Sequence, residues 1–162
     1  METKSIEPAI FALESEENNT FVFLVAFADI GCELRYKICS SIDRELTQRS
    51  IGPLGEIFSE DLEYRFENNI WKGLTLSYTD KITGRIVSIV LINIGKIIRD
   101  AKSSPRYFLM NILSHEIRRL VDYIVIQREN SMTEVEEEPA YFTGNLFEHS
   151  IQFYEEYLQN MQ

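Results

Sequence analysis

The stretch His115-Glu116-Ile117-Arg118-Arg119 contains most of the motif with which zinc peptidases hold their metal ion on a helix. That motif is H-E-x-x-H, because two imidazoles four residues apart share one helix face and can bind one ion. Here Arg119 stands in place of the second histidine. A guanidinium keeps its proton in a protein and has no lone pair to offer a metal. The motif therefore favours a binding or structural role over catalysis.

A zinc site of this type takes a third protein ligand from a later helix, and the glutamate after the first histidine activates the zinc-bound water as general base. The matching positions in this chain are His115 as a ligand, Glu116 as the base and Glu137 as the third ligand. The run Glu137-Glu138-Pro139-Ala140 has the E-x-x-A spacing of such a third-ligand helix. Each motif alone is common by chance, whereas the order of helix, break and acidic helix start is more specific.

Two further residues are candidates for the missing ligand. Asp122 lies one turn beyond Arg119 and could supply an oxygen, which would give a harder site that suits zinc less well. His149 is the other histidine of the chain, and it lies twelve residues beyond Glu137. That separation is ~18 Å along a continuous helix, so His149 is too far away to reach the same ion.

Our preferred interpretation of Arg119 is that its charge replaces the dication. The guanidinium would pair with Glu137, and with Glu116 as a second partner, across two helices. A bidentate pair of this kind has a specific geometry, and Gly144 would let the helices approach closely. The net stabilisation would be small, because desolvation opposes the attraction. The sequence therefore predicts an internal clamp made of Arg119, Glu137 and Glu116.

The same residues also have ordinary structural interpretations. His115 could be a hydrogen-bonded core or interface histidine, and Glu116 a buried acid paired with an arginine. The acids Glu136–Glu138 suit a helix N-terminus, where the macrodipole favours negative charge. These interpretations need no metal and no reaction.

The pattern of expected strands and helices predicts one α+β domain over residues 20–162. An acidic leader or docking arm over residues 1–19 is expected to precede it. The strongest hairpin signal joins two β-rich runs through Asp80-Lys81-Ile82-Thr83-Gly84. The expected small, mainly antiparallel sheet has strands at 20–28, 71–79 and 85–93. The expected four helices lie at 33–49, 54–67, 104–128 and 136–158. The segment 94–100 is ambiguous.

Periodicity predicts which helix faces turn inward. The helix over 104–128 begins at a serine cap with Pro105 in its first turn. Its inward stripe contains Leu109, Ile112, Leu113, Ile117, Leu120, Val121 and Ile124, with His115, Arg119 and Asp122 on a neighbouring stripe. The inward face of the last helix is expected at Ala140, Gly144, Phe147, Ile151, Tyr154 and Leu158.

Composition excludes some partners. The formal net charge is −10, and residues 129–162 contain eight acids and no Lys or Arg. Acidic ends argue against nucleic acid as a partner, which needs clustered positive charge. They permit docking on a basic protein surface, or they form a solvated face that keeps the protein soluble. Cys32 and Cys39 are expected to be reduced thiols of a cytosolic protein. We find no signal peptide and no membrane-spanning run, so no membrane partner is expected.

The second half of the chain resembles a set of small phage and mobile-element proteins of gut Bacteroidetes. The similarity is carried by Ser114–Tyr123 (SHEIRRLVDY) and Glu136–Gly144 (EEEPAYFTG). Those proteins read approximately C-H-E-L-R-H-L-V-D and then E-E-x-A-Y-L-T-G. Gly73–Tyr78 (GLTLSY) and Ile89–Lys96 (IVLINIGK) look like the family's hairpin. The resemblance implies a zincin-like helix pair and places the family's second histidine at Arg119.

The resemblance also implies a function, because some of these proteins are encoded among tail and head–tail genes. We expect a non-catalytic, zincin-like structural or assembly protein (a pseudoenzyme) at the tail or head–tail junction of a bacteriophage. It would work as a homo-oligomer or with phage structural proteins, in the virion or the host cytoplasm, without a cofactor. Its expected interaction surface on the last helix contains Phe142, Phe153, Tyr157, Glu155 and Glu156.

Two alternatives remain open from the sequence. The first is a metal-dependent peptidase with a degenerate site, in which zinc is bound by His115 and Glu137 and Glu116 is catalytic. The second is a small acidic inhibitor or regulator that binds a basic protein partner through the acidic C-terminal third.

Overall fold

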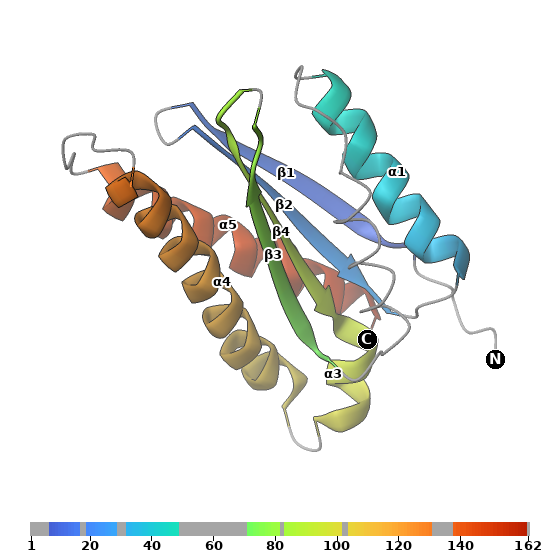
Figure 1. The fold of residues 1–162 in the computed structure, drawn as a ribbon. Helices are drawn as coiled ribbons and strands as arrows, with labels where there is room; N and C mark the ends of the chain where they lie inside the picture. The colour runs from blue at the N-terminus through green and yellow to red at the C-terminus, as the bar shows by residue number, and fades with distance from the viewer. Residues whose placement is uncertain are drawn as a thin grey trace.

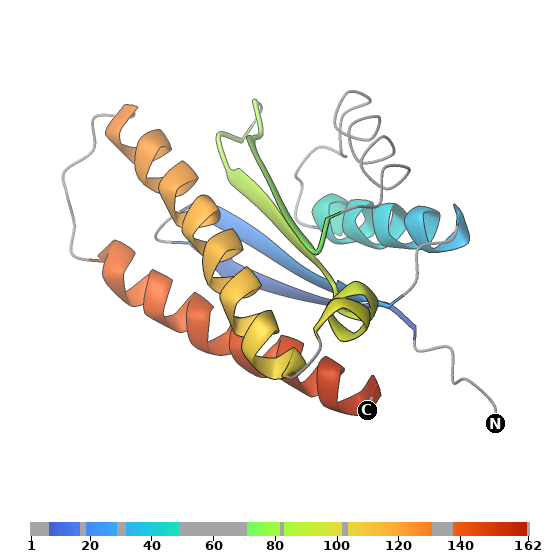
Figure 2. The same ribbon diagram turned by 90° about the horizontal axis from the view of Figure 1, so that it is seen from below.

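The computed structural model of this protein describes residues 7–16, 19–28, 32–48, 71–81, 83–101, 104–130 and 138–161. As expected, the fold is α+β. Figure 2 shows the sheet between helix α1 on one side and helices α4 and α5 on the other. The strands are β1 (Ala9–Ser15), β2 (Thr20–Phe27), β3 (Gly73–Thr79) and β4 (Ile86–Asn93). The helices are α1 (Cys32–Gln48), α3 (Ile94–Asp100), α4 (Pro105–Asn130) and α5 (Glu138–Met161).

The sheet has the strand order β1-β2-β4-β3 (Figure 1). β1 pairs with β2 and β3 with β4 in antiparallel fashion, whereas the two central strands β2 and β4 are parallel. Every residue of β2 and β4 is buried. These strands therefore carry continuous apolar runs in place of an alternating pattern, because helices cover both of their faces.

The two faces of the sheet form separate cores. On one face, Ile38, Ile42 and Leu46 of α1 pack against β2, β3 and β4. On the other face, α4 and α5 pack against the alternate residues of β2 and β4. The predicted inward stripe of α4 is confirmed, since Leu109, Leu113, Ile117, Leu120 and Ile124 are all buried.

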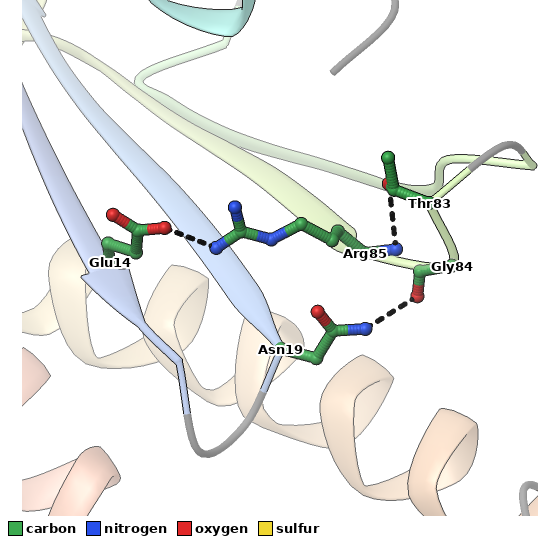
Figure 3. Close-up of polar contacts among 5 residues, drawn as sticks. All are labelled: Glu14, Asn19, Thr83, Gly84 and Arg85. Atoms are coloured by element: carbon green, nitrogen blue, oxygen red, sulfur yellow. Dashed lines mark hydrogen bonds and ion pairs between the residues drawn. The ribbon is translucent and has the colours of Figure 1, made fainter. Parts of the chain in front are cut away.

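The two hairpins are joined at one end of the sheet. In the turn between β3 and β4, the N–H of Gly84 donates to the carbonyl of Asp80 at 2.8 Å, and Gly84 has φ = 71°. Asn19, in the turn between β1 and β2, donates from Nδ2 to the carbonyl of Gly84 at 3.0 Å (Figure 3). Arg85 forms an ion pair with Glu14 of β1 (Figure 3). These contacts join β1 to the β3–β4 hairpin, which the sequence predicted most strongly.

The expectation of a leader outside the domain is wrong for Ala9–Ser15, which form the edge strand β1. The physical reason is the run Ala9–Leu13, whose five residues are all apolar. Ile10 and Ala12 pack on the α1 side of the sheet, and Ala9 and Leu13 pack on the α5 side. The acids on either side of this run had suggested a solvated segment. Residues 1–6 lie outside the described part of the chain.

Other boundaries differ less from those expected. The ambiguous segment 94–100 is helix α3, whose first turn is capped by Asn93 Oδ1 accepting from the N–H of Lys96 at 3.1 Å. The helix expected over 54–67 lies outside the described residues. Among the helices that the structure describes, none is long and apolar enough to cross a bilayer.

The inward face of α5 is rotated relative to the expected one. Leu146, Ser150 and Tyr157 are buried together with the expected Tyr154 and Leu158. Gly144 is exposed, and a Cβ built on it has no described atom within 4 Å. The expectation that Gly144 allows two helices to approach closely is therefore wrong, because its helix turns this position to solvent.

Candidate functional site

Helix α4 carries the residues of the degenerate zinc motif and separates them onto two sides. His115, Arg119 and Asp122 are exposed. Glu116 is buried, with only 4% of its surface exposed. Adjacent residues on a helix point ~100° apart. The side chain of His115 therefore lies in solvent, while that of Glu116 lies against the sheet.

Glu116 has a specific partner on strand β3. The hydroxyl of Thr75 lies 2.6 Å from Oε2 of Glu116, to which it donates, and 3.1 Å from the backbone carbonyl of Glu116. Hydrogen bonds to an ionised carboxylate are among the strong ones in proteins. Glu116 is thus a buried acid, as one structural interpretation held, but the described partner is a threonine instead of an arginine.

Gly73 makes room for this contact. A Cβ on Gly73 would lie 2.7 Å from Cγ2 of Ile112 and 3.0 Å from Cγ of Glu116. Such distances are below ordinary van der Waals contact, so α4 approaches β3 more closely than a larger residue at position 73 allows. Glu116, Thr75 and Gly73 together define how α4 packs on this edge of the sheet.

The arrangement does not bring the metal-site residues together. In a working site the carboxylate after the histidine reaches the water on the metal ion, whereas here His115 is exposed and the carboxylate of Glu116 is buried and bonded to Thr75. Within the described ranges, no group of three His, Cys, Asp or Glu side chains is placed to hold a metal ion. Glu137, the expected third ligand, lies outside these ranges.

The expected clamp between Arg119 and Glu116 is not formed. Arg119 is exposed, and no ion pair joins it to Glu116, whose carboxylate is directed at β3. α4 continues for eleven residues beyond Arg119, which is ~16 Å along the axis. α5 begins at Glu138, at that far end of α4 (Figure 2). Glu137 itself lies outside the described residues, so its pairing with Arg119 stays a prediction.

The expected interaction surface on α5 is only partly exposed. Tyr157 does not belong to it, because Tyr157 is 6% exposed and its hydroxyl donates to the carbonyl of Glu7 at 3.1 Å. Phe153 is half-buried, and Glu156 is exposed. Glu155 accepts a hydrogen bond of 2.7 Å from Nε of Arg106 on α4. The side chain of Phe142 lies outside the described ones.

Tyr154 has a role that sequence reasoning missed. Its hydroxyl accepts from the N–H of Val25 on β2 at 3.1 Å and donates to the carbonyl of Val90 on β4 at 2.8 Å. The phenol thus bridges the two parallel central strands. Burial raises the pKa of Tyr154 well above its usual value, and the charge of Glu116 adds to this effect. The sequence marks Tyr154 as inward-facing, but it gives no sign of this bridge.

A hollow of about 350 Å³ lies between the start of β1 and helix α1. It is lined by Glu7, Pro8, Ile10, Lys37, Ser40, Ser41 and Arg44. Nζ of Lys37 lies 3.5 Å from Oε2 of Glu7, and Arg44 is exposed. The spacing of Lys37, Ser41 and Arg44 places them on one flank of a helix. The sequence pattern did not point to this hollow, because its other wall exists only once residues 9–15 form a strand.

Comparison of the chain with models of known protein families, with curated proteins and with solved structures gave no match.

Proposed function

We propose that this protein is a non-catalytic structural or assembly protein that works by binding other protein chains. The orientation of Glu116 is the observation that carries the proposal. The acid that would activate water in a peptidase is bonded to Thr75 and joins α4 to β3. The H-E pair is then a remnant of a zincin-like helix whose acid serves packing. Arg119 in place of the second histidine fits the same conclusion, since a guanidinium is no metal ligand.

The finer proposal is a component of a bacteriophage virion, at the tail or head–tail junction, that works in an oligomer. It rests on the resemblance carried by Ser114–Tyr123 and Glu136–Gly144. A half-exposed apolar edge strand, β1, supports the coarser part of it. The outward-facing backbone groups of an edge strand can pair with another chain.

The proposal is tested by measuring zinc per chain and hydrolysis of an unfolded protein substrate, for the natural protein and for Arg119→His. The substitution restores the second imidazole but leaves the carboxylate of Glu116 bonded to Thr75. We therefore expect zinc-dependent hydrolysis from neither protein. One zinc ion per natural chain, with hydrolysis that is lost in Glu116→Gln, would overturn the proposal in favour of a metal-dependent peptidase.

Mass photometry of the protein, alone and with the products of neighbouring genes, tests the assembly role. We expect defined oligomers or complexes. A chain that stays monomeric throughout and joins none of these products contradicts the role in assembly.

A further inference from the structure

We infer that the open edge of β1, with the hollow beside it, binds an extended segment of another protein in which apolar and acidic residues alternate. The inference rests on the proposed function and names its binding surface and the chemistry of its partner. β1 lies beside α1 along one border of the sheet (Figure 1).

The edge itself is suited to strand addition. Among the described strands, β1 pairs on one side only, with β2, and the register is one-to-one over Ala9–Ser15. The five residues Ala9–Leu13 are apolar, and Phe11 is 40% exposed. Edge strands are normally protected by charges, proline or a bulge, and Ala9–Leu13 contains none of these. An extended peptide can therefore add to β1 through main-chain hydrogen bonds.

The face of β1 that is turned to α1 offers positive charge. Ile10 lines the hollow together with Lys37, Ser40, Ser41 and Arg44. Lys37 already holds one carboxylate, that of Glu7, at 3.5 Å, and both side chains of this pair are more than half exposed. Exposed pairs of this kind contribute little stability, so a second carboxylate can take the place of Glu7. Arg44 forms no ion pair with another described residue.

The opposite face of β1 offers aromatic surface. The ring of Phe11 stacks on His149 of α5 with 6.3 Å between centroids, and it lies 5.9 Å from the ring of Phe153. All three side chains are partly exposed. This face suits an apolar side chain.

A strand added beside β1 sends successive side chains to these two faces in turn. Side chains on the α1 face meet two cations and two serine hydroxyls, so carboxylates fit there. Side chains on the α5 face meet Phe11, so apolar groups fit there. A second copy of β1 fits this pattern poorly, because Ala9–Leu13 contains no acid and the one acid of the strand, Glu14, already pairs with Arg85. The partner is therefore another protein with an alternating apolar and acidic strand.

The test is binding of a labelled hexapeptide of alternating valine and glutamate, followed by fluorescence anisotropy. We expect binding that weakens about tenfold or more in Arg44→Glu, as for loss of a charge-assisted hydrogen bond. Arg118→Glu is the matched control, an exposed arginine on α4 whose replacement leaves binding unchanged. A peptide of alternating valine and lysine should not bind.

Backbone methylation of the peptide tests the strand itself. N-methyl groups on one set of alternate residues block the donors that face β1, and those on the other set face solvent. We expect one methylated peptide to lose binding and the other to keep it. Absence of binding, equal affinity in Arg44→Glu and Arg118→Glu, or equal loss in both methylated peptides each contradicts the inference.

Failure of the inference about the β1 edge can be distinguished from failure of the proposed assembly role. An assembly that forms without zinc and equally well with Arg44→Glu keeps the binding role but removes the β1 edge from it. A dimer that pairs β1 with β1 assigns the edge to a second copy and overturns the partner named here.

Discussion

The hydroxyl of Thr75 on β3 lies 2.6 Å from the carboxylate of Glu116 on α4, to which it donates. This bond joins the central helix of the degenerate motif to an edge strand of the sheet. It explains why an acid occupies a position that is only 4% exposed, because buried charges need hydrogen-bond partners. The most peptidase-like pair of residues in the sequence therefore contributes, through its acid, to packing.

A double-mutant cycle measures this bond. We expect Thr75→Val and Glu116→Met each to lower the free energy of unfolding by about 1–3 kcal/mol, because Thr75→Val leaves the buried carboxylate without its donor and Glu116→Met removes the closer acceptor of Thr75. The double variant should lose less than the sum, with a coupling of about 1 kcal/mol or more. Urea unfolding gives all four values. His115→Ala, an exposed change next to Glu116, should stay within about 0.5 kcal/mol. Strictly additive losses would show that the bond adds no stability.

Gly73 lies where α4 approaches β3 closely, and Gly144 on the exposed side of α5 serves as its control. Gly73→Ala places a Cβ 2.7 Å from Ile112 and should cost about 1–3 kcal/mol through overpacking. Gly144→Ala lies on an exposed helix face with open space and should stabilise by about 0.5–1 kcal/mol through helix propensity. Thermal or urea unfolding of the two variants decides between them. Equal effects at both positions would show that α4 adjusts its distance from the sheet.

Arg119→Ala distinguishes an exposed arginine from an internal clamp. Since Arg119 is exposed, we expect the free energy of unfolding to change by no more than about 0.5 kcal/mol. If Arg119 were paired with Glu137, the substitution would leave a carboxylate without its partner, and the free energy of unfolding would fall by clearly more. Arg118→Ala, the exposed neighbour on the same helix, is the control. A large loss in Arg119→Ala alone would establish the clamp.

Much of the fold could be predicted from the sequence because its signals are local. The β3–β4 hairpin follows from two apolar runs around a short polar turn, and the stripe of α4 follows from helical spacing. β1 escaped prediction because its five apolar residues lie between acids, and its pairing with β2 depends on contacts distant in sequence. The inward face of α5 was expected too close to Phe147 and Ile151, which are half-buried, although the exposed polar residues Asn145, Glu148 and Gln152 mark the opposite side of the helix.

The direction of Glu116 had one signal in the sequence. Glu116 follows Ile112 by four residues, so the two side chains share the flank of α4 that packs on β3. The H-E-x-x-H pattern concerns the spacing of His115 and Arg119, whereas the direction of Glu116 follows from its spacing to Ile112. Gly73 supplies the missing room and Thr75 the donor, but both lie about 40 residues earlier in the chain. Pattern reading does not connect positions so far apart.

Tyr154 predicts how stability depends on alkaline pH. Its pKa is raised above the usual 10.0, chiefly by burial, and burial together with Asp80 and Asp43 also raises the pKa of Tyr78. The folded protein therefore keeps phenolic protons that the unfolded chain loses above its tyrosine pKa. By linkage, this contribution is fully present below about pH 10 and is lost as the pH rises through the raised pKa values.

Tyr154→Phe isolates one of these contributions. At neutral pH the variant should unfold about 1–3 kcal/mol more easily, because the N–H of Val25 and the carbonyl of Val90 lose their common partner. Above about pH 10 the natural protein loses the stability that comes from the protonated phenol of Tyr154. The difference in the free energy of unfolding between the natural protein and the variant should therefore shrink. Urea unfolding of both proteins across this range measures the difference. Tyr107→Phe, at a position that is 78% exposed, controls for loss of a phenol outside the core. An advantage that stays constant to high pH would show that the bridging phenol ionises as easily in the folded chain as in the unfolded one.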